Sequence, residues 1–517
     1  MPRGSIQTLL GPSPGGVRED ISPAIIPEGY YQASSNWLTR RGRGRPRPGY
    51  DLLTTATDTT RVIGLGFRGS RQLGNNIVIF TKSHQYHFNG STIADISHAS
   101  YTSSADNELV RSLTWTQSGT DYILALNRSN DLMEWSGSGV FTTTSGTPPA
   151  GKDMFVLGNR LVALQPDGNM YRVQWSAFKD RTSWPTTVNQ ADLRDTPGYP
   201  VAGAPFSPNT GAIYKDDAIY LASVQAAVEP FQFQFVGLVP GPMSAAALVN
   251  AMGVHYWIGE DFSIYKFDGA EPKLVSSGLT RTIATNINYS DRDQSFGYAS
   301  ISQDFREVWF FYPNRSGTFN AVSCNIITEA INHHTFTSDT ITAASEWRMG
   351  GATIDGLDAF SATIDGLDTP YSTIDSMDGN NPVEPTILIG TSAGEVHILN
   401  GTYVDDDGTA ITWNFEDRWV APGANQARVQ VDAVDTLWRQ CDGPITVTAG
   451  VAVTDKLTGT ETSTTTVTFN VNSDEQHLLT FPNMRGKLVR VRYSGTAVSQ
   501  NLEYRGGILT SWPRGRV

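Results

Sequence analysis

The hydrophobic positions of the chain recur in short runs separated by polar turns, and one hairpin pattern returns along most of its length. A continuously apolar run is followed by a polar turn, then by a run in which apolar and polar residues alternate, then by glycine. The pattern occurs at residues 78–90, 124–137, 256–269 and 387–401, and in weaker form at 161–173 and 218–237. A continuously apolar strand is expected to be buried on both faces, and an alternating strand on one face. Hairpins repeated at tens of residues predict the blades of a β-propeller.

The predicted propeller-like domain covers residues 51–408 and contains about six blades. A run of irregular β-sandwiches is the alternative interpretation of the same pattern. After Gly408 the composition of the apolar runs changes. The runs at 445–453 and 461–471 are rich in Thr and Val, and the run at 488–493 alternates apolar residues with Arg. Runs of this length predict a small antiparallel β-sandwich at 409–517.

Residues 1–50 are expected to form an extended N-terminal arm, because prolines and glycines interrupt them throughout. Only Tyr30 to Leu38 is predicted to form a helical turn or two. The arm ends in a basic run: Arg40, Arg41, Arg43, Arg45 and Arg47. Such a run is either a solvated tail or a contact with an acidic neighbour or with DNA phosphates. Because the chain as a whole is acidic, we expect contact with a sister subunit or an adaptor.

Composition supports an all-β chain with more than one core. The 517 residues include 49 Gly and 27 Pro, and only 17% are charged; Thr, Ser and Asn make up much of the polar remainder, a mixture poor in helix formers. The net charge of −13 disfavours a general nucleic-acid-binding surface. Cys324 and Cys441 are expected to be buried free thiols. No stretch reaches membrane-spanning length and no signal core opens the chain, so a soluble protein in a reducing compartment is expected.

Motifs that mimic catalytic sites lack the context that the chemistry needs. Gly64 to Gly69 has the glycine spacing of a dinucleotide loop, but no helix follows to hold a pyrophosphate, so a turn is predicted. Gly390 to Gly394 resembles a nucleophile elbow but lies between the strands of a hairpin, so Ser392 is predicted to be a turn residue.

Candidate metal and acid-base residues are equally isolated. His333 and His334 have no further ligand at a suitable spacing, and the aspartates at 405–407 match no calcium-binding loop. No carboxylate pair for glycoside cleavage stands out. The sequence therefore predicts no catalytic, cofactor-binding or metal-binding residues.

A seven-residue motif occurs in three copies at a spacing of ten residues, beginning at Ala352, Ala362 and Ser372, of which the first two are identical and the third is closely similar. Each copy contains an apolar pair that we expect to anchor the repeat: Ile354, Leu357, Ile364, Leu367, Ile374 and Met377. Each copy also contains an acidic pair, and together these pairs form an acidic ribbon: Asp355, Asp358, Asp365, Asp368, Asp375 and Asp378. A fixed period indicates one small unit stacked on itself. Without a reactive group, the ribbon favours architecture over catalysis.

Several segments, taken in order along the chain, form a recognisable series of motifs. At the opening they are Pro14 to Asp20, Asn36-Trp37 and Arg40 to Tyr50. At the centre they are Gly158 to Val162, Val173 to Ser176 with Trp184, and His255 to Gly269, and at the ending Gly506 to Arg516. In this order the motifs resemble tail proteins of short-tailed bacteriophages: the tail nozzle (tail tubular protein B) and the packaged-DNA stabilisation, or tail hub, proteins.

The resemblance implies a structural protein of the virion tail, assembled in the host cytoplasm as a homohexameric ring. Such a ring surrounds the DNA-exit channel, retains the packaged genome, supports its ejection, and contacts adaptor or portal-proximal proteins and tail fibres or spikes. Genomic DNA is expected to pass without sequence-specific binding, because an acidic wall repels phosphate over about 8–10 Å. The family supplies no catalytic residues. A glycan-binding or glycan-degrading propeller protein of a phage is the alternative.

Overall fold

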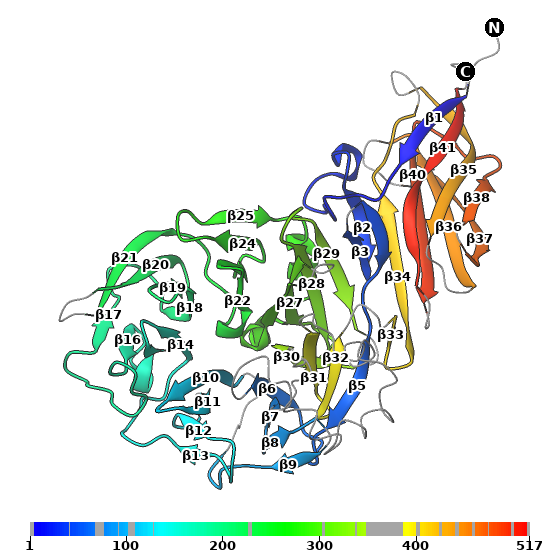
Figure 1. Ribbon diagram of the computed structural model, residues 1–517. Helices are drawn as coiled ribbons and strands as arrows, with labels where there is room; N and C mark the ends of the chain where they lie inside the picture. The colour runs from blue at the N-terminus through cyan, green and yellow to red at the C-terminus, as the bar shows by residue number, and fades with distance from the viewer. Residues whose placement is uncertain are drawn as a thin grey trace, which may run out of the picture.

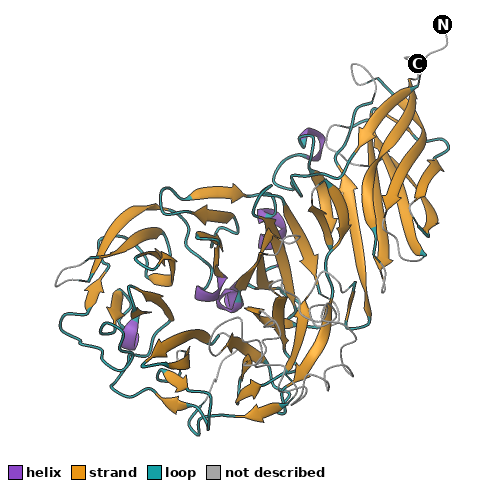
Figure 2. Ribbon diagram, viewed as in Figure 1, coloured by secondary structure: helices purple, strands orange, loops and turns teal. Residues whose placement is uncertain are grey.

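The computed structural model describes residues 5–40, 42–67, 77–90, 92–101, 109–127, 129–225, 230–301, 306–336, 339–347, 386–399, 404–422, 427–439, 444–456, 461–473, 475–497 and 501–513. Nearly all of its regular elements are β-strands (Figure 2), so the predicted all-β class is confirmed. The helical elements in these ranges are α1 (Thr280–Asn286) and the 3-10 turns η1 (Pro23–Ile25), η2 (Pro166–Gly168), η3 (Ala245–Ala247) and η4 (Tyr289–Gln294). No helix among these residues is long and apolar enough to cross a bilayer.

Six separate four-stranded antiparallel sheets form blades of a β-propeller (Figure 1), so the predicted propeller fold is confirmed. In each blade the strands follow chain order from the axis outward. The first three blades are β6 (Val62–Phe67), β7 (Ile77–Thr81), β8 (Gln85–Phe88) and β9 (Ile93–Asp95); β10 (Arg111–Gln117), β11 (Thr120–Leu126), β12 (Met133–Trp135) and β13 (Thr142–Thr143); and β14 (Asp153–Leu157), β15 (Arg160–Leu164), β16 (Arg172–Trp175) and β17 (Gln190–Asp192). The next three are β18 (Pro200–Ser207), β19 (Thr210–Lys215), β20 (Ala218–Val224) and β21 (Phe231–Leu238); β22 (Leu248–Ala251), β23 (Val254–Ile258), β24 (Ile264–Phe267) and β25 (Lys273–Ser276); and β26 (Phe296–Ile301), β27 (Arg306–Pro313), β28 (Phe319–Asn325) and β29 (Ile331–Thr335).

Four further strands complete the circle between the last of these blades and the first. They are β30 (Ile341–Trp347), β31 (Thr386–Thr391), β32 (Glu395–Leu399) and β5 (Tyr50–Thr55), in that order. Since β5 precedes the first blade in the chain, the ring is closed by pairing between its two ends. The same sheet continues through β33 (Asp405–Asp406) into the C-terminal strands, which makes it ten-stranded.

The hairpin pattern of the sequence corresponds to consecutive strands within blades. All five residues of β7 are buried, as expected for a strand between two neighbouring blades. The predicted turn at Gly64 to Gly69 is wrong over its described part, because Gly64 and Gly66 lie inside β6, the innermost strand of its blade. A Cβ added at Gly66 would lie 2.5 Å from the hydroxyl of Ser112 on β10. A larger residue there would displace the side chains of Ser112 and Ile123, so glycine suits the close approach of the innermost strands around the axis.

The C-terminal strands form the predicted β-sandwich. One layer contains β34 (Thr409–Asp417), β40 (Leu488–Ala497), β36 (Ile445–Thr454) and β37 (Ser463–Val471), with β2 (Tyr31–Ser35) beside β34. The other contains β3 (Trp37–Arg40), β4 (Arg43–Pro46), β41 (Glu503–Pro513), β35 (Val429–Arg439) and β38 (Glu475–Thr480), with β1 (Ile6–Leu10) beside β41 and β39 (Arg485–Gly486) beside β35. Aromatic rings fill the space between the layers, where Trp37 stacks on Phe415 with ring centroids 4.5 Å apart.

The N-terminal segment is extended, as predicted, and it lies along the chain's own body. Its strands β1 and β2 pair with β41 and β34 of the sandwich. Between them, the backbone N–H of Val17 donates to the carbonyl of Ile331 on β29. The expected helical turn at Tyr30 to Leu38 is wrong, because Tyr31 and Trp37 instead enter the sandwich core from β2 and β3. The segment therefore joins the sandwich to the propeller.

Candidate functional site

Of the five arginines predicted to contact a neighbouring subunit, the structure describes four, in and beside the β3–β4 hairpin, and it places them differently. Arg40 is buried and donates two hydrogen bonds, of 2.6 and 2.7 Å, to the carboxylate of Glu307 on β27. Glu307 is itself only 2% exposed. Because this ion pair lies inside the junction between sandwich and propeller, the predicted external contact is wrong for Arg40.

Arg47 forms a second buried junction. Its guanidinium donates to both carboxylate oxygens of Asp406, at 2.8 and 2.5 Å. The remaining N–H groups donate to the side-chain oxygen of Asn36 and to the carbonyls of Pro48 and Thr335. Each of the five donors of an arginine is thereby satisfied inside the chain. The predicted contact with another subunit is therefore wrong for Arg47 as well.

The other arginines of the run differ in position. Arg43 has a side chain 43% exposed, and its Nε lies 3.2 Å from Glu503 on β41. Arg45 occupies the same face of β4, because the intervening Gly44 faces the indole of Trp37. Arg41 lies outside the described residues. For these three arginines an external contact stays a prediction.

The repeat at 352–378 also lies outside the described residues. The anchor role of its apolar pairs and the acidic ribbon of its aspartates therefore remain predictions from sequence. Its place in the chain is between β30 and β31, in the set of strands that closes the propeller.

A half-open cavity of about 340 Å³ lies between the innermost strands near the propeller axis. Its lining comes from β6, β10, β22, β26 and β30 and consists mainly of glycine, hydroxyl and apolar residues. Among the described residues of this lining Arg111 alone is charged, and its Nε donates at 2.8 Å to the fully buried Asp153. Asp153 also accepts a hydrogen bond from the backbone N–H of Gly203. The described lining contains neither a carboxylate pair nor a nucleophile beside a base, the groups that hydrolysis requires.

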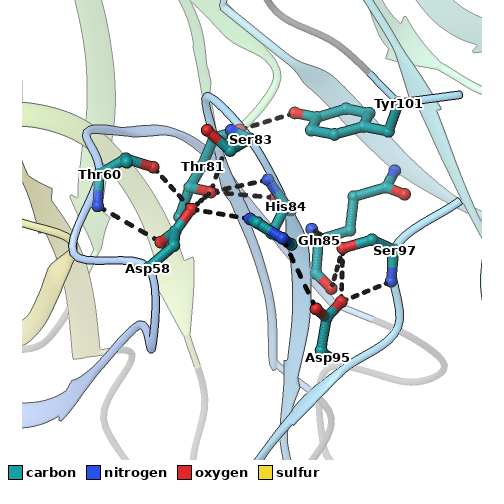
Figure 3. A network of polar contacts seen from close by, with 9 residues as sticks. All are labelled: Asp58, Thr60, Thr81, Ser83, His84, Gln85, Asp95, Ser97 and Tyr101. Carbon is teal, nitrogen blue, oxygen red and sulfur yellow. Dashed lines mark hydrogen bonds and ion pairs between the residues drawn. The ribbon is translucent and has the colours of Figure 1, made fainter. Parts of the chain in front are cut away.

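A polar network beside the first blade places one histidine between two carboxylates (Figure 3). His84 Nδ1 lies 3.1 Å from Asp58, and Nε2 lies 3.8 Å from Asp95. Asp58 also accepts hydrogen bonds of 2.7 Å from the hydroxyls of Thr60 and Thr81. Partial burial raises the pKa of Asp58, but these hydrogen bonds and that from His84 outweigh burial and hold the pKa below its usual value.

The hydroxyl groups of this network make hydrogen bonds that hold neighbouring segments of the chain together. Ser97 donates to Asp95 at 2.5 Å, and Tyr101 donates to the carbonyl of Thr81 at 2.9 Å (Figure 3). Neither hydroxyl donates to the imidazole, so neither is activated as a nucleophile. The network holds the segment between β5 and β6 against the turn between β7 and β8, next to the place where the ring closes.

The adjacent histidines considered as metal ligands are buried on β29 and point to opposite faces. His333 Nε2 lies 3.2 Å from the hydroxyl of Tyr312, and His334 Nε2 lies 2.8 Å from that of Ser323. Burial lowers the pKa of His333 to about 4 and that of His334 well below its usual value, so both rings are neutral. In the described ranges, no three His, Cys, Asp or Glu side chains are grouped to hold a metal ion. Ser392 occupies the β31–β32 turn, as predicted.

The partners of the buried arginines, Glu307 and Asp406, were not predicted from the sequence. In the sequence, Asp406 stands out only as one of three consecutive aspartates. One local signal was available, because Arg43 and Arg45 alternate with glycine and proline at the period of a strand. That periodicity indicates one arginine face but not which carboxylates it meets.

No protein-family model matches this sequence, and no curated protein matches it. Among solved structures, BamB from Moraxella catarrhalis is 10% identical over 71% of this chain and 96% of that chain, with a TM-score of 0.37. The BP39L lectin from Burkholderia pseudomallei is 12% identical over 66% and 95%, with a TM-score of 0.42. BBS1N, solved in complex with ARL6DN, is 9% identical over 68% and 96%, with a TM-score of 0.38. Similarities this remote carry no argument about function.

Proposed function

We propose that this chain is a structural subunit of a short bacteriophage tail, of the nozzle or hub type. In this proposal it assembles as a homohexameric ring around the DNA-exit channel, retains the packaged genome and supports its ejection. The observation that supports the proposal most is that the motifs resembling this family make structural joints rather than a reactive site.

The opening motifs lie at the junction of propeller and sandwich, and the closing motif lies within the sandwich. Gly16, in the first motif, packs against Ile331 on β29, and a Cβ there would lie 2.3 Å from its carbonyl oxygen. Arg47, in the next motif, forms the buried ion pair described above. Gly506, in the last motif, has a φ of +123° and lies against the carbonyl of Leu10 on β1. The opening motifs thereby connect the two parts of the fold, and the last motif holds β1 against β41 within the sandwich.

The central motifs connect strands within blades and across neighbouring blades. Arg160 donates to the carbonyl of Ser176 at 3.0 Å, across the β15–β16 hairpin. His255 on β23 lies 2.9 Å from the hydroxyl of Tyr214 and 3.2 Å from the carbonyl of Pro205, both in the preceding blade. Burial lowers the pKa of His255 to about 4, so the ring is neutral and acts as a structural bridge. A subunit that must withstand DNA pressure benefits from such rigid joints.

Immunogold labelling of purified virions with an antibody against this chain tests the proposal. Label confined to the tail tip supports a tail protein. Particles assembled by a phage in which the gene is disrupted should lose their packaged DNA. Virions without label would contradict the proposal. Depolymerisation of host capsule by the purified protein would favour the glycan-degrading alternative, and binding to capsule without cleavage would favour a glycan-binding protein.

A further inference from the structure

The edges of the sheets are protected almost everywhere in this protein. Among the outer strands of the blades, β9, β13, β17 and β25 have only two to four residues. The edge of β29 is covered by the N-terminal segment, whose Val17 and Asn36 donate backbone hydrogen bonds to it. The edge of β5 is covered by β33. Short or covered edges are the usual means by which β-proteins avoid pairing with other chains.

Strand β21 lacks each of these protections. It has eight residues, Phe231 to Leu238, and none of them is charged. It is the last strand of its sheet, and no other strand in the described part of the chain pairs with it beyond β20. Phe235 and Leu238 are 43% and 69% exposed. A long, uncharged, partly apolar edge is a template for pairing with a further strand.

Strand β37 has the same character at the edge of the sandwich. Its nine residues, Ser463 to Val471, carry no charge, and within the described ranges the strand pairs only with β36. Four threonines and two valines favour the extended conformation. The neighbouring edge strand β38 differs, since it is shorter and carries Glu475.

The two unprotected edges lie at opposite ends of the molecule, β21 in the propeller and β37 in the sandwich (Figure 1). We infer that β21 of one copy of this chain pairs with β37 of the next copy. Their lengths of eight and nine residues match. Cross-strand contacts of aromatic with β-branched side chains, such as Phe233 beside Val467, stabilise paired strands. A single head-to-tail contact covers both edges.

A head-to-tail contact has a consequence for assembly. Because the two surfaces differ, every copy keeps one edge free for the next copy, and the series either closes into a ring or continues as a filament. The inference rests on the proposed ring and names the surfaces that build it. If each edge instead paired with itself, β21 with β21, the product would have twofold symmetry.

Two blocked variants of the full chain test this arrangement by sedimentation velocity. The first carries Gln232→Lys and Gln234→Lys on β21, and the second carries Thr466→Lys and Thr468→Lys on β37; all four positions are exposed. A lysine at an edge opposes pairing because its charge must be desolvated. The matched control carries Thr142→Lys and Thr143→Lys on the short strand β13. Circular dichroism and thermal melting establish that each variant is folded.

The wild-type protein and the control should assemble beyond dimers, and each blocked variant alone should be monomeric. An equal mixture of the two blocked variants should form a one-to-one dimer and nothing larger, since it contains one intact β21 and one intact β37 per pair. Dimers of a single blocked variant, unaltered assembly, or a wild type that stays monomeric at its solubility limit would each overturn the inference.

The inference and the proposed function can fail separately. A sixfold tail ring that survives both blocks would overturn the edge contact and leave the tail assignment intact. Assembly through these edges by a protein absent from virions would do the reverse.

Discussion

The buried ion pair between Arg47 and Asp406 yields the sharpest stability prediction. Both side chains are almost inaccessible, with 1% and 2% of their surface exposed. Substituting Arg47→Ala removes both hydrogen bonds to the carboxylate and leaves Asp406 as an unpaired buried charge. Removing one partner of a buried pair costs about 3–5 kcal/mol. We expect a loss of this size in the free energy of unfolding.

Two matched variants separate the cost of the orphaned charge from the loss of an ordinary ion pair. Arg172 and Asp192 form a pair at 2.8 Å whose side chains are 29% and 27% exposed. Since partly solvated pairs contribute roughly 0–1 kcal/mol, Arg172→Ala should have little effect. The double variant Arg47→Met with Asp406→Leu leaves no orphaned charge, so it should be more stable than Arg47→Ala alone.

Urea unfolding monitored by circular dichroism measures these differences, with linear extrapolation to water. A decrease of less than about 1 kcal/mol in the free energy of unfolding of Arg47→Ala would refute the reasoning, because an unpaired buried carboxylate destabilises the folded state by more than that. If the Arg47→Ala variant kept its stability but no longer assembled, Arg47 would instead contact another subunit, as the sequence predicted.

Three further predictions concern other buried positions. Burial raises the pKa of Asp417 from 3.8 to about 7. Between these pH values the folded state holds a proton that the unfolded state releases, so the free energy of unfolding should fall as the pH rises from about 4 to about 7. Asp417→Asn should remove this fall in urea titrations at a series of pH values. Burial raises the pKa of Cys324 to about 12, so in a Cys441→Ser variant no thiol should react with a disulfide reagent until the protein unfolds, and rapid reaction of the native protein would contradict its burial. Gly16→Ala should loosen the N-terminal segment and speed its proteolysis, because φ is +74° and the new Cβ would overlap a backbone carbonyl of β29, whereas Gly11→Ala, with nothing within 4 Å, should not; equal cleavage rates would contradict this packing.

The hairpins of the propeller could be predicted because each joins a continuously apolar run to a run in which apolar and polar residues alternate. The blade of β26 to β29 was not predicted, because its hairpin lacks this pattern. Its central strands β27 and β28 are both buried over nearly their whole length, so the alternating half of the pattern is absent. A continuously apolar pair of strands cannot be distinguished from other buried segments by periodicity alone.

The arginine run illustrates what the sequence could not provide. The run itself was evident, but the partners of Arg40 and Arg47 lie 267 and 359 residues away along the chain. No local pattern specifies which of 51 acidic residues meets a given arginine. The prediction of an external contact therefore rested on the general tendency of charge runs to be solvent-exposed. It is wrong for Arg40 and Arg47, which are buried against carboxylates of the same chain.

Class averages of the purified protein, or of virion tails, from electron microscopy test the central proposal most directly. The account predicts a ring of six copies around an open channel, with each propeller joined to the sandwich of its neighbour. Averages that show a monomer, a twofold dimer, or a tail of another symmetry would contradict it.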